Sequence, residues 1–233
     1  MEAGERFVEA AKNWELDLAK KIFFDSLPNP FPINYINKKG EKAIDFWKTG
    51  WAFNFIQFLV EQGHPLNEGE FNFIFKAIEL RCEIDMLKFL INKGAYLGVE
   101  GETNAFHIAV QRGTFESVKF LSQFFTIDCK DENGNTPLNL LCQYCDSQSR
   151  LDICVSPCNN CLRKAFFLME NGADINSKNK FGSTPFASAC VSGSDQLLLA
   201  LMAYDVETDV CTDFGVRARK YYYENWGHGV ITF

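Results

Sequence analysis

The sequence predicts an all-α fold, a solenoid of about six helix-turn-helix units with short finger loops and a cysteine-rich insertion. The first observation behind this prediction is a recurring segment, which reads GNTPL at residues 134–138 and GSTPF at residues 182–186. The second is a spacing of 33 residues from Gly101 to Gly134, which is repeated from the start of the second segment to Gly215. Repetition at such a period is typical of repeat proteins.

The spacing between the two clearest copies also predicts an insertion. Gly134 and Gly182 are 48 residues apart, which equals one period of 33 residues and 15 extra residues. We therefore expect an insertion at about residues 145–161, within the repeat that follows the first copy.

Helix starts and ends are marked in the repeats. The Thr-Pro pair of the recurring segment predicts a helix start, because threonine caps free amides and proline tolerates the first helical position. Apolar helical stretches end at Gly63, Gly94 and Gly172, and glycine there suits a left-handed C-cap. Residues 117–121 fit the helical part of this pattern, but an aromatic pair at 124–125 replaces the glycine, so this copy is degenerate.

Each repeat thus consists of a turn, a short helix, a tight turn, a longer helix and a loop, with apolar residues at helical spacing. Neither helix could bury its apolar stripe alone, so the repeats must stack in series. The sequence resembles the ankyrin-repeat family over roughly 37–218. The elements that match are the TPL and TPF pairs, NAFH at 104–107 and GADIN at 172–176.

The resemblance and the period together suggest a domain plan. Residues 1–36 form an N-terminal capping helical unit, residues 37–211 form the ankyrin repeats, and residues 212–233 form a C-terminal cap or tail. The six repeats, the capping unit included, are placed at 5–36, 37–67, 68–98, 99–131, 132–178 and 179–211. The second and third depart from the family pattern, since residues 42–45 and 71–74 stand where TPLH is expected.

Composition limits the class of protein. Hydrophobic residues make up 47% of the chain and charged residues 23%, which is too apolar for a disordered protein. The net charge of -7 argues against a nucleic-acid partner, because such binding depends on clustered lysine and arginine. No stretch is apolar enough over the length needed to cross a bilayer, so we expect no membrane partner. Nine cysteines without a secretory signal indicate a cytoplasmic or nuclear protein.

The insertion contains a candidate metal site. Two CxxC pairs, Cys142 with Cys145 and Cys158 with Cys161, are separated by twelve residues. Zinc favours four tetrahedral thiolates, and paired cysteines at this spacing turn two sulfurs toward one ion. We therefore predict a possible structural Zn²⁺ bound by these four residues, although Cys154 could replace one of them.

Two other interpretations of the cysteines stay open. Cys142 could lie on the core face of its helix while Cys161 opens the next helix, with reduced thiols acting as small apolar groups. The cluster from Cys142 to Cys161 could instead carry a redox or enzymatic activity, which would need a thiol of low pKa close to a base.

The sequence otherwise favours binding over catalysis. His107 occupies the histidine position of the TPLH frame, where the resemblance implies a structural hydrogen bond, and we identify no catalytic residues and no bound organic cofactor. Stacked repeats create a long concave surface of finger loops and first helices. We therefore expect a non-catalytic adaptor or assembly subunit that binds a protein or peptide partner. The oligomeric state is not indicated.

Overall fold

The computed structural model describes residues 2–27, 32–46, 52–68, 71–144 and 157–208. The chain divides into two compact units, Met1–Tyr96 and Leu97–Phe233, called here the N-terminal and C-terminal units. The described residues form eleven α-helices, one 3-10 helix and a minimal hairpin of two-residue strands, which confirms the predicted all-α fold. None of the described helices combines the length and hydropathy needed to cross a membrane.

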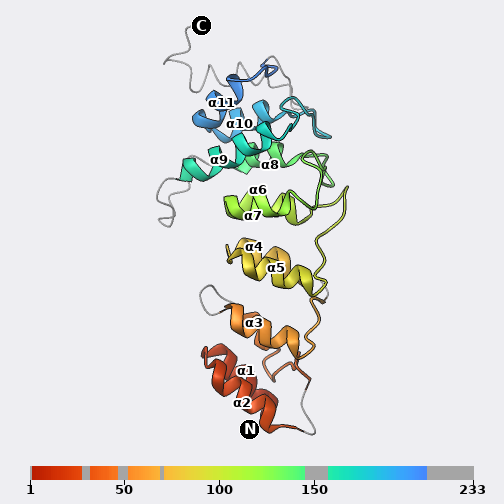
Figure 1. The fold of residues 1–233 in the computed structure, drawn as a ribbon, viewed down its shortest axis with the longest axis vertical. Helices are drawn as coiled ribbons and strands as arrows, with labels where there is room; N and C mark the ends of the chain where they lie inside the picture. The colour runs from red at the N-terminus through yellow and green to blue at the C-terminus, as the bar shows by residue number, and fades with distance from the viewer. Residues whose placement is uncertain (1, 28–31, 47–51, 69–70, 145–156, 209–233) are drawn as a thin grey trace. The chain divides into compact units, whose positions relative to one another are not determined.

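The N-terminal unit contains three helix pairs (Figure 1). Its elements are α1 (Ala3–Lys12), α2 (Leu16–Asp25), η1 (Ala43–Phe46), α3 (Ala52–Glu61), β1 (Asn67–Glu68), β2 (Phe71–Asn72), α4 (Phe73–Glu79) and α5 (Ile84–Asn92). The second pair begins with the 3-10 helix η1 instead of an α-helix. Strands β1 and β2 are antiparallel, with Asn67 opposite Asn72 and Glu68 opposite Phe71.

Aromatic side chains fill the interior of the N-terminal unit. Phe7 of α1 and Phe23 of α2 are buried, with ring centroids 6.2 Å apart. Phe58 of α3 meets Phe23 edge-on at 5.7 Å, which joins the second helix pair to the first. Edge-to-face pairs of this kind add to the free energy gained by burial, so these contacts both fill and orient the core.

The C-terminal unit contains three further helix pairs in two layers (Figure 1). The pairs are α6 (Ala105–Arg112) with α7 (Phe115–Leu121), α8 (Pro137–Tyr144) with α9 (Pro157–Glu170), and α10 (Pro185–Ser192) with α11 (Asp195–Met202). Helix α8 packs against both α6 and α10 in the inner layer, and α9 packs against both α7 and α11 in the outer layer. This stacking is the solenoid arrangement that the sequence predicts.

The predicted helix ends are confirmed. The Thr184 hydroxyl accepts a hydrogen bond from the Ala187 amide at 3.2 Å, and Pro185 occupies the first turn. The Thr136 hydroxyl accepts from the Asn139 amide at 3.3 Å in the same way. Gly63, Gly94 and Gly172 all have φ between 84° and 91°, the left-handed conformation expected of C-caps.

The insertion differs from the expected one at its C-terminal end. The segment 157–161 is helical, because α9 begins at Pro157 and extends over 14 residues, against 7 in α7 and 8 in α11. Part of the extra sequence therefore lengthens an outer helix. Residues 145–156 of the expected insertion lie outside the described residues, as does the expected C-terminal cap from residue 209 onward.

A buried lysine anchors this long helix to the preceding pair. Lys164 of α9 is only 2% exposed, and its Nζ donates to the carbonyl oxygens of Ala109, Val110 and Gly113 at 3.1, 2.9 and 2.7 Å. A lysine ammonium carries three N–H donors, and the last carbonyls of a helix have no partner within the helix. Lys164 therefore caps the C-terminus of α6 from a helix more than 50 residues away in sequence.

Replacing Lys164 by methionine tests this cap. Lys164→Met keeps a long apolar stem but leaves three buried carbonyls without the amine, so we expect a loss of about 1–3 kcal/mol in the free energy of unfolding. Urea denaturation measures the change. Lys119→Met, at an exposed position on α7, removes the same charge and should change the stability little. Equal effects of the two substitutions would contradict the capping role.

Candidate protein-binding groove

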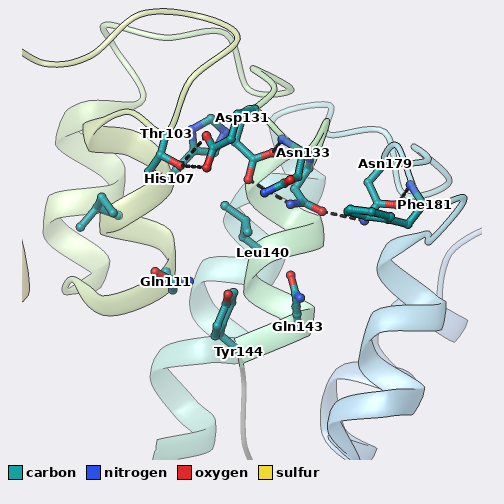
Figure 2. Close-up of a pocket in the computed structure, with 13 residues that line it drawn as sticks. Thr103, His107, Gln111, Asp131, Asn133, Leu140, Gln143, Tyr144, Asn179 and Phe181 are labelled. Atoms are coloured by element: carbon teal, nitrogen blue, oxygen red, sulfur yellow. Dashed lines mark hydrogen bonds between the residues drawn. The ribbon is translucent and has the colours of Figure 1, made fainter.

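A pocket of about 310 Å³ opens on the inner layer of the C-terminal unit, and we call it the groove. Its floor is formed by α6 and α8, which contribute Ile108 and Gln111 from one helix and Leu140, Gln143 and Tyr144 from the other. Two loops form its rim, and Figure 2 shows their side chains above the two helices. These loops, residues 131–135 and 179–183, are the finger loops that precede α8 and α10.

Each finger loop is a tight turn built around one acceptor side chain. The Asp131 carboxylate accepts from the backbone amides of Asn133 at 2.9 Å and Asn135 at 2.8 Å. Asn179 repeats this arrangement in the next finger, where its side-chain oxygen accepts from the amides of Phe181 and Ser183, both at 2.9 Å. Such side-chain bonds to nearby amides stabilise turns without strand or helix partners.

The same turn occurs in the N-terminal unit. The Asn37 side-chain oxygen accepts from the amides of Lys39 at 2.9 Å and Glu41 at 2.8 Å. In all three turns an aspartate or asparagine stands three residues before a glycine with positive φ, at Gly40, Gly134 and Gly182. Gly134 and Gly182 marked two of these turns in the sequence, and the acceptor residue three positions earlier is a further sequence signal for the fingers.

The two finger loops of the groove are also bonded to each other. The Asn179 side-chain amide donates to the Asn135 side-chain oxygen at 2.8 Å, and the Lys180 amide donates to the Asn133 carbonyl at 2.9 Å. A Cβ at Gly134 would lie 3.2 Å from the Lys180 nitrogen, so the loops approach too closely for a larger residue to fit without displacement. The rim of the groove is therefore held in one shape before any partner binds.

His107 has the structural role that the sequence predicts. Its Nδ1 accepts from the Asn104 amide at 3.3 Å, and its Nε2 lies 3.0 Å from the Cys129 carbonyl, to which a neutral ring donates. The ring is 1% exposed, and burial lowers the pKa of His107 below its ordinary value of 6.5. The neutral imidazole thus connects the start of α6 to the base of the finger that begins at Asp131.

Glu132 gives the rim of the groove its exposed negative charge. The Thr103 hydroxyl lies 2.8 and 3.1 Å from the two carboxylate oxygens. A hydrogen bond from its own backbone amide and a second from Thr103 lower the pKa of Glu132, so the carboxylate is ionised at neutral pH. Among the described residues that line the groove, Asp131 and Glu132 are acidic, and none is a lysine or an arginine.

Two exposed aromatic rings border the groove. Tyr144, at the end of α8, is 55% exposed, and Phe181, in the second finger, is 48% exposed. Large apolar side chains held on the surface at a concave site are frequent anchors of protein interfaces. The repeat pattern predicts a surface of finger loops and first helices but does not distinguish either residue within it.

The four predicted zinc ligands are only partly described. Cys142 is fully buried in α8, and Cys161 is half-buried in α9. Cys158 lies in the first turn of α9 with its side chain undescribed, and Cys145 falls outside the described residues, as does Cys154. Across the described part of the chain, no group of three or more His, Cys, Asp or Glu side chains is arranged to hold a metal. The predicted zinc site stays a prediction.

Two other thiols of the C-terminal unit, those of Cys129 and Cys190, have little nucleophilic character. Burial raises the pKa of Cys129 to about 11 and that of Cys190 to about 12. A reactive cysteine needs a thiolate at neutral pH, which requires a lowered pKa. These two residues therefore act as small core side chains.

The two-layered helix pairs and the finger turns define a helical-repeat protein, and comparisons with known proteins show which kind of repeat it contains. Residues 74–155 match the family model described as ankyrin repeats in three copies. The solved ankyrin-repeat domain of human ASB11 superposes with a TM-score of 0.69 at 19% identity, over 91% of this chain and 89% of that domain. The chain therefore contains ankyrin repeats and has the ankyrin-repeat fold.

Two curated relatives share part of the sequence. The ankyrin repeat protein OPG189 of Variola virus is 31% identical over 110 residues, which cover 39% of this chain and 20% of that protein. The human transient receptor potential cation channel subfamily A member 1 is 30% identical over 135 residues, which cover 56% of this chain and 11% of the channel. The chain thus spans about a fifth or less of the length of these relatives.

The His107 network makes stability depend on pH. Because the pKa of His107 is lower in the folded protein than in the unfolded chain, the unfolded chain binds more protons below about pH 6.5. The stabilising contribution is present above that pH and is lost as the pH falls through the folded-state pKa. We expect the melting temperature of the wild type to fall between pH 7.5 and pH 5 more steeply than that of His107→Asn. If differential scanning calorimetry shows that the melting temperatures of the two proteins change with pH in parallel, His107 is not the group responsible.

Proposed function

We propose that this chain is a non-catalytic protein-interaction module, an adaptor or assembly subunit, which binds a protein or peptide segment in the groove of its C-terminal unit. Ankyrin repeats generally act as protein-binding modules, and the groove lies on the surface of inner helices and fingers. Its partner therefore contacts α6, α8 and the two finger loops.

The observation that carries this proposal is a concave site with a rigid rim and exposed aromatic rings. The hydrogen bonds between the finger loops fix the rim, so little conformational entropy is lost when a partner binds. A volume of about 310 Å³ accommodates a few side chains of an extended segment rather than a whole folded domain. The rest of the interface then extends over neighbouring helices and loops.

Aromatic truncation tests the groove. We expect the double variant Tyr144→Ala, Phe181→Ala to lose affinity for its partner by a factor of roughly ten or more, since anchor residues typically contribute above 1 kcal/mol each. Affinity capture from cell extract followed by titration of the recovered partner measures the loss. Phe166→Ala, at a 39% exposed position on the outer helix α9, provides a matched control that should bind normally. Equal binding by the double variant and the wild type would refute the groove as the site.

We further propose that a structural zinc ion joins the cysteines at the two ends of the insertion, in a protein of the cytoplasm or nucleus. Cys142 lies in α8 and Cys161 in α9, and these two helices pack against each other. Cys158 and Cys161 are three residues apart in one helix, a spacing that places both on one face. Four thiolates would stabilise the insertion by tying α8 to the start of α9.

Metal analysis tests the zinc proposal. Purified protein should hold about one zinc ion per chain under reducing conditions, and Cys145→Ser or Cys158→Ser should lower both the zinc content and the melting temperature. Cys82→Ser, in the N-terminal unit, should keep its zinc. Protein without bound metal, or variants that retain it, would overturn the proposal. Reactive thiols at these four positions would instead favour a redox role.

A further inference from the structure

We propose that the groove selects a basic side chain, arginine in preference to lysine, followed by an apolar residue in an extended segment of the partner. This inference rests on the proposed function, because it specifies the chemistry of the ligand at the same site. Charge, the acceptor capacity of one carboxylate and the position of one aromatic ring each support it.

The charge around the fingers is the first argument. Glu132 is exposed on the rim, and its neighbour Asp131 is buried with both carboxylate oxygens accepting hydrogen bonds from its own loop. The adjoining loop is linked to this finger by the bond from the Gly101 amide to the Lys130 carbonyl at 2.9 Å. The two linked loops contain four carboxylates, from Glu100, Glu102, Asp131 and Glu132, and one amine, from Lys130, and the second finger adds Lys180.

The carboxylate of Glu132 retains acceptor capacity. The Thr103 hydroxyl and the backbone amides of Thr103 and Glu132 donate to it, which leaves part of its roughly four acceptor positions for a ligand. The nearby Lys180 amine is bonded elsewhere, since its Nζ donates to the Glu132 main-chain carbonyl at 2.6 Å. The main-chain bond occupies the lysine amine and leaves the carboxylate able to bind a further donor.

The shape of the groove orients the ligand. Figure 2 shows Thr103 and Asp131 at the finger end of the pocket, and Gln143 and Tyr144 at the helix end. A basic head group bound at Glu132 therefore places the next residues toward the exposed Tyr144 ring, which suits an apolar side chain. The side-chain amides of Gln111 and Gln143 face the space between and can bond the main chain of an extended segment.

Arginine fits this end of the groove better than lysine. Its planar guanidinium binds a carboxylate through two parallel hydrogen bonds and is less strongly hydrated than an ammonium. An acidic side chain in the same place would face Glu132 with a charge of the same sign, so acidic peptides should be excluded.

Peptide selection on the purified chain of 233 residues tests the inference. Phage-displayed random peptides recovered on the wild type should be enriched in arginine followed by an apolar residue. Replacing that arginine by citrulline, which is neutral and of similar shape, should weaken binding of the synthetic peptide by a factor of roughly ten. Glu132→Gln should cause a loss of similar size and should abolish the difference between the two peptides.

Two control variants separate this inference from the proposed function. Glu170→Gln removes the same charge from an exposed position on α9 and should leave peptide binding unchanged. If the selected peptides lack a basic residue, the proposed ligand is wrong. The same holds if Tyr144→Ala weakens binding and Glu132→Gln does not, although the groove would then still be the binding site. If neither Tyr144→Ala nor Glu132→Gln affects any selected peptide, both the ligand and the groove are refuted.

Discussion

The burial of one apolar stripe on each inner helix determines the arrangement of the C-terminal unit. Phe106, Leu138 and Phe186 occupy equivalent positions in α6, α8 and α10, and each is at most 2% exposed. No single helix pair can cover such a residue, so each pair depends on its neighbour for burial. Because the helical period places Gln143 and Tyr144 on another face of α8, the stacking that buries Leu138 also turns these side chains toward solvent. The groove is thus a geometric consequence of the core.

The sequence predicts most of this architecture because its signals are local and repeated. Thr-Pro pairs and capping glycines act within a few residues, and their period of 33 residues indicates the stacking directly. For the groove, the sequence predicts only that the finger loops and first helices form a concave surface. In a chain with 23 phenylalanines, an aromatic residue is expected to lie in the core, so residue type alone did not mark Tyr144 as exposed. Its exposure follows from the packing of α8 between α6 and α10.

Lys164 shows why long-range polar contacts escape sequence analysis. A lone lysine in an amphipathic helix is normally assigned to the solvated face, because burying an amine without partners is costly. Its three carbonyl partners lie 51 to 55 residues earlier, beyond the insertion, and become available only because α6 ends beside α9. The three hydrogen bonds compensate for the burial of the Lys164 amine. They also connect the repeat that contains the insertion to the repeat that precedes it.

The degenerate repeat at residues 99–131 is held together by several non-covalent contacts. It lacks a capping glycine after α7, and Phe125 instead stacks on Phe106 with the two rings 6° from parallel. His107 adds its bond to the Cys129 carbonyl, at the base of the finger that carries Glu132. Protonation of His107 would remove the acceptor at Nδ1 and so weaken the start of α6. The stability of this repeat and the position of the carboxylate that we assign to ligand selection therefore depend on the same neutral imidazole.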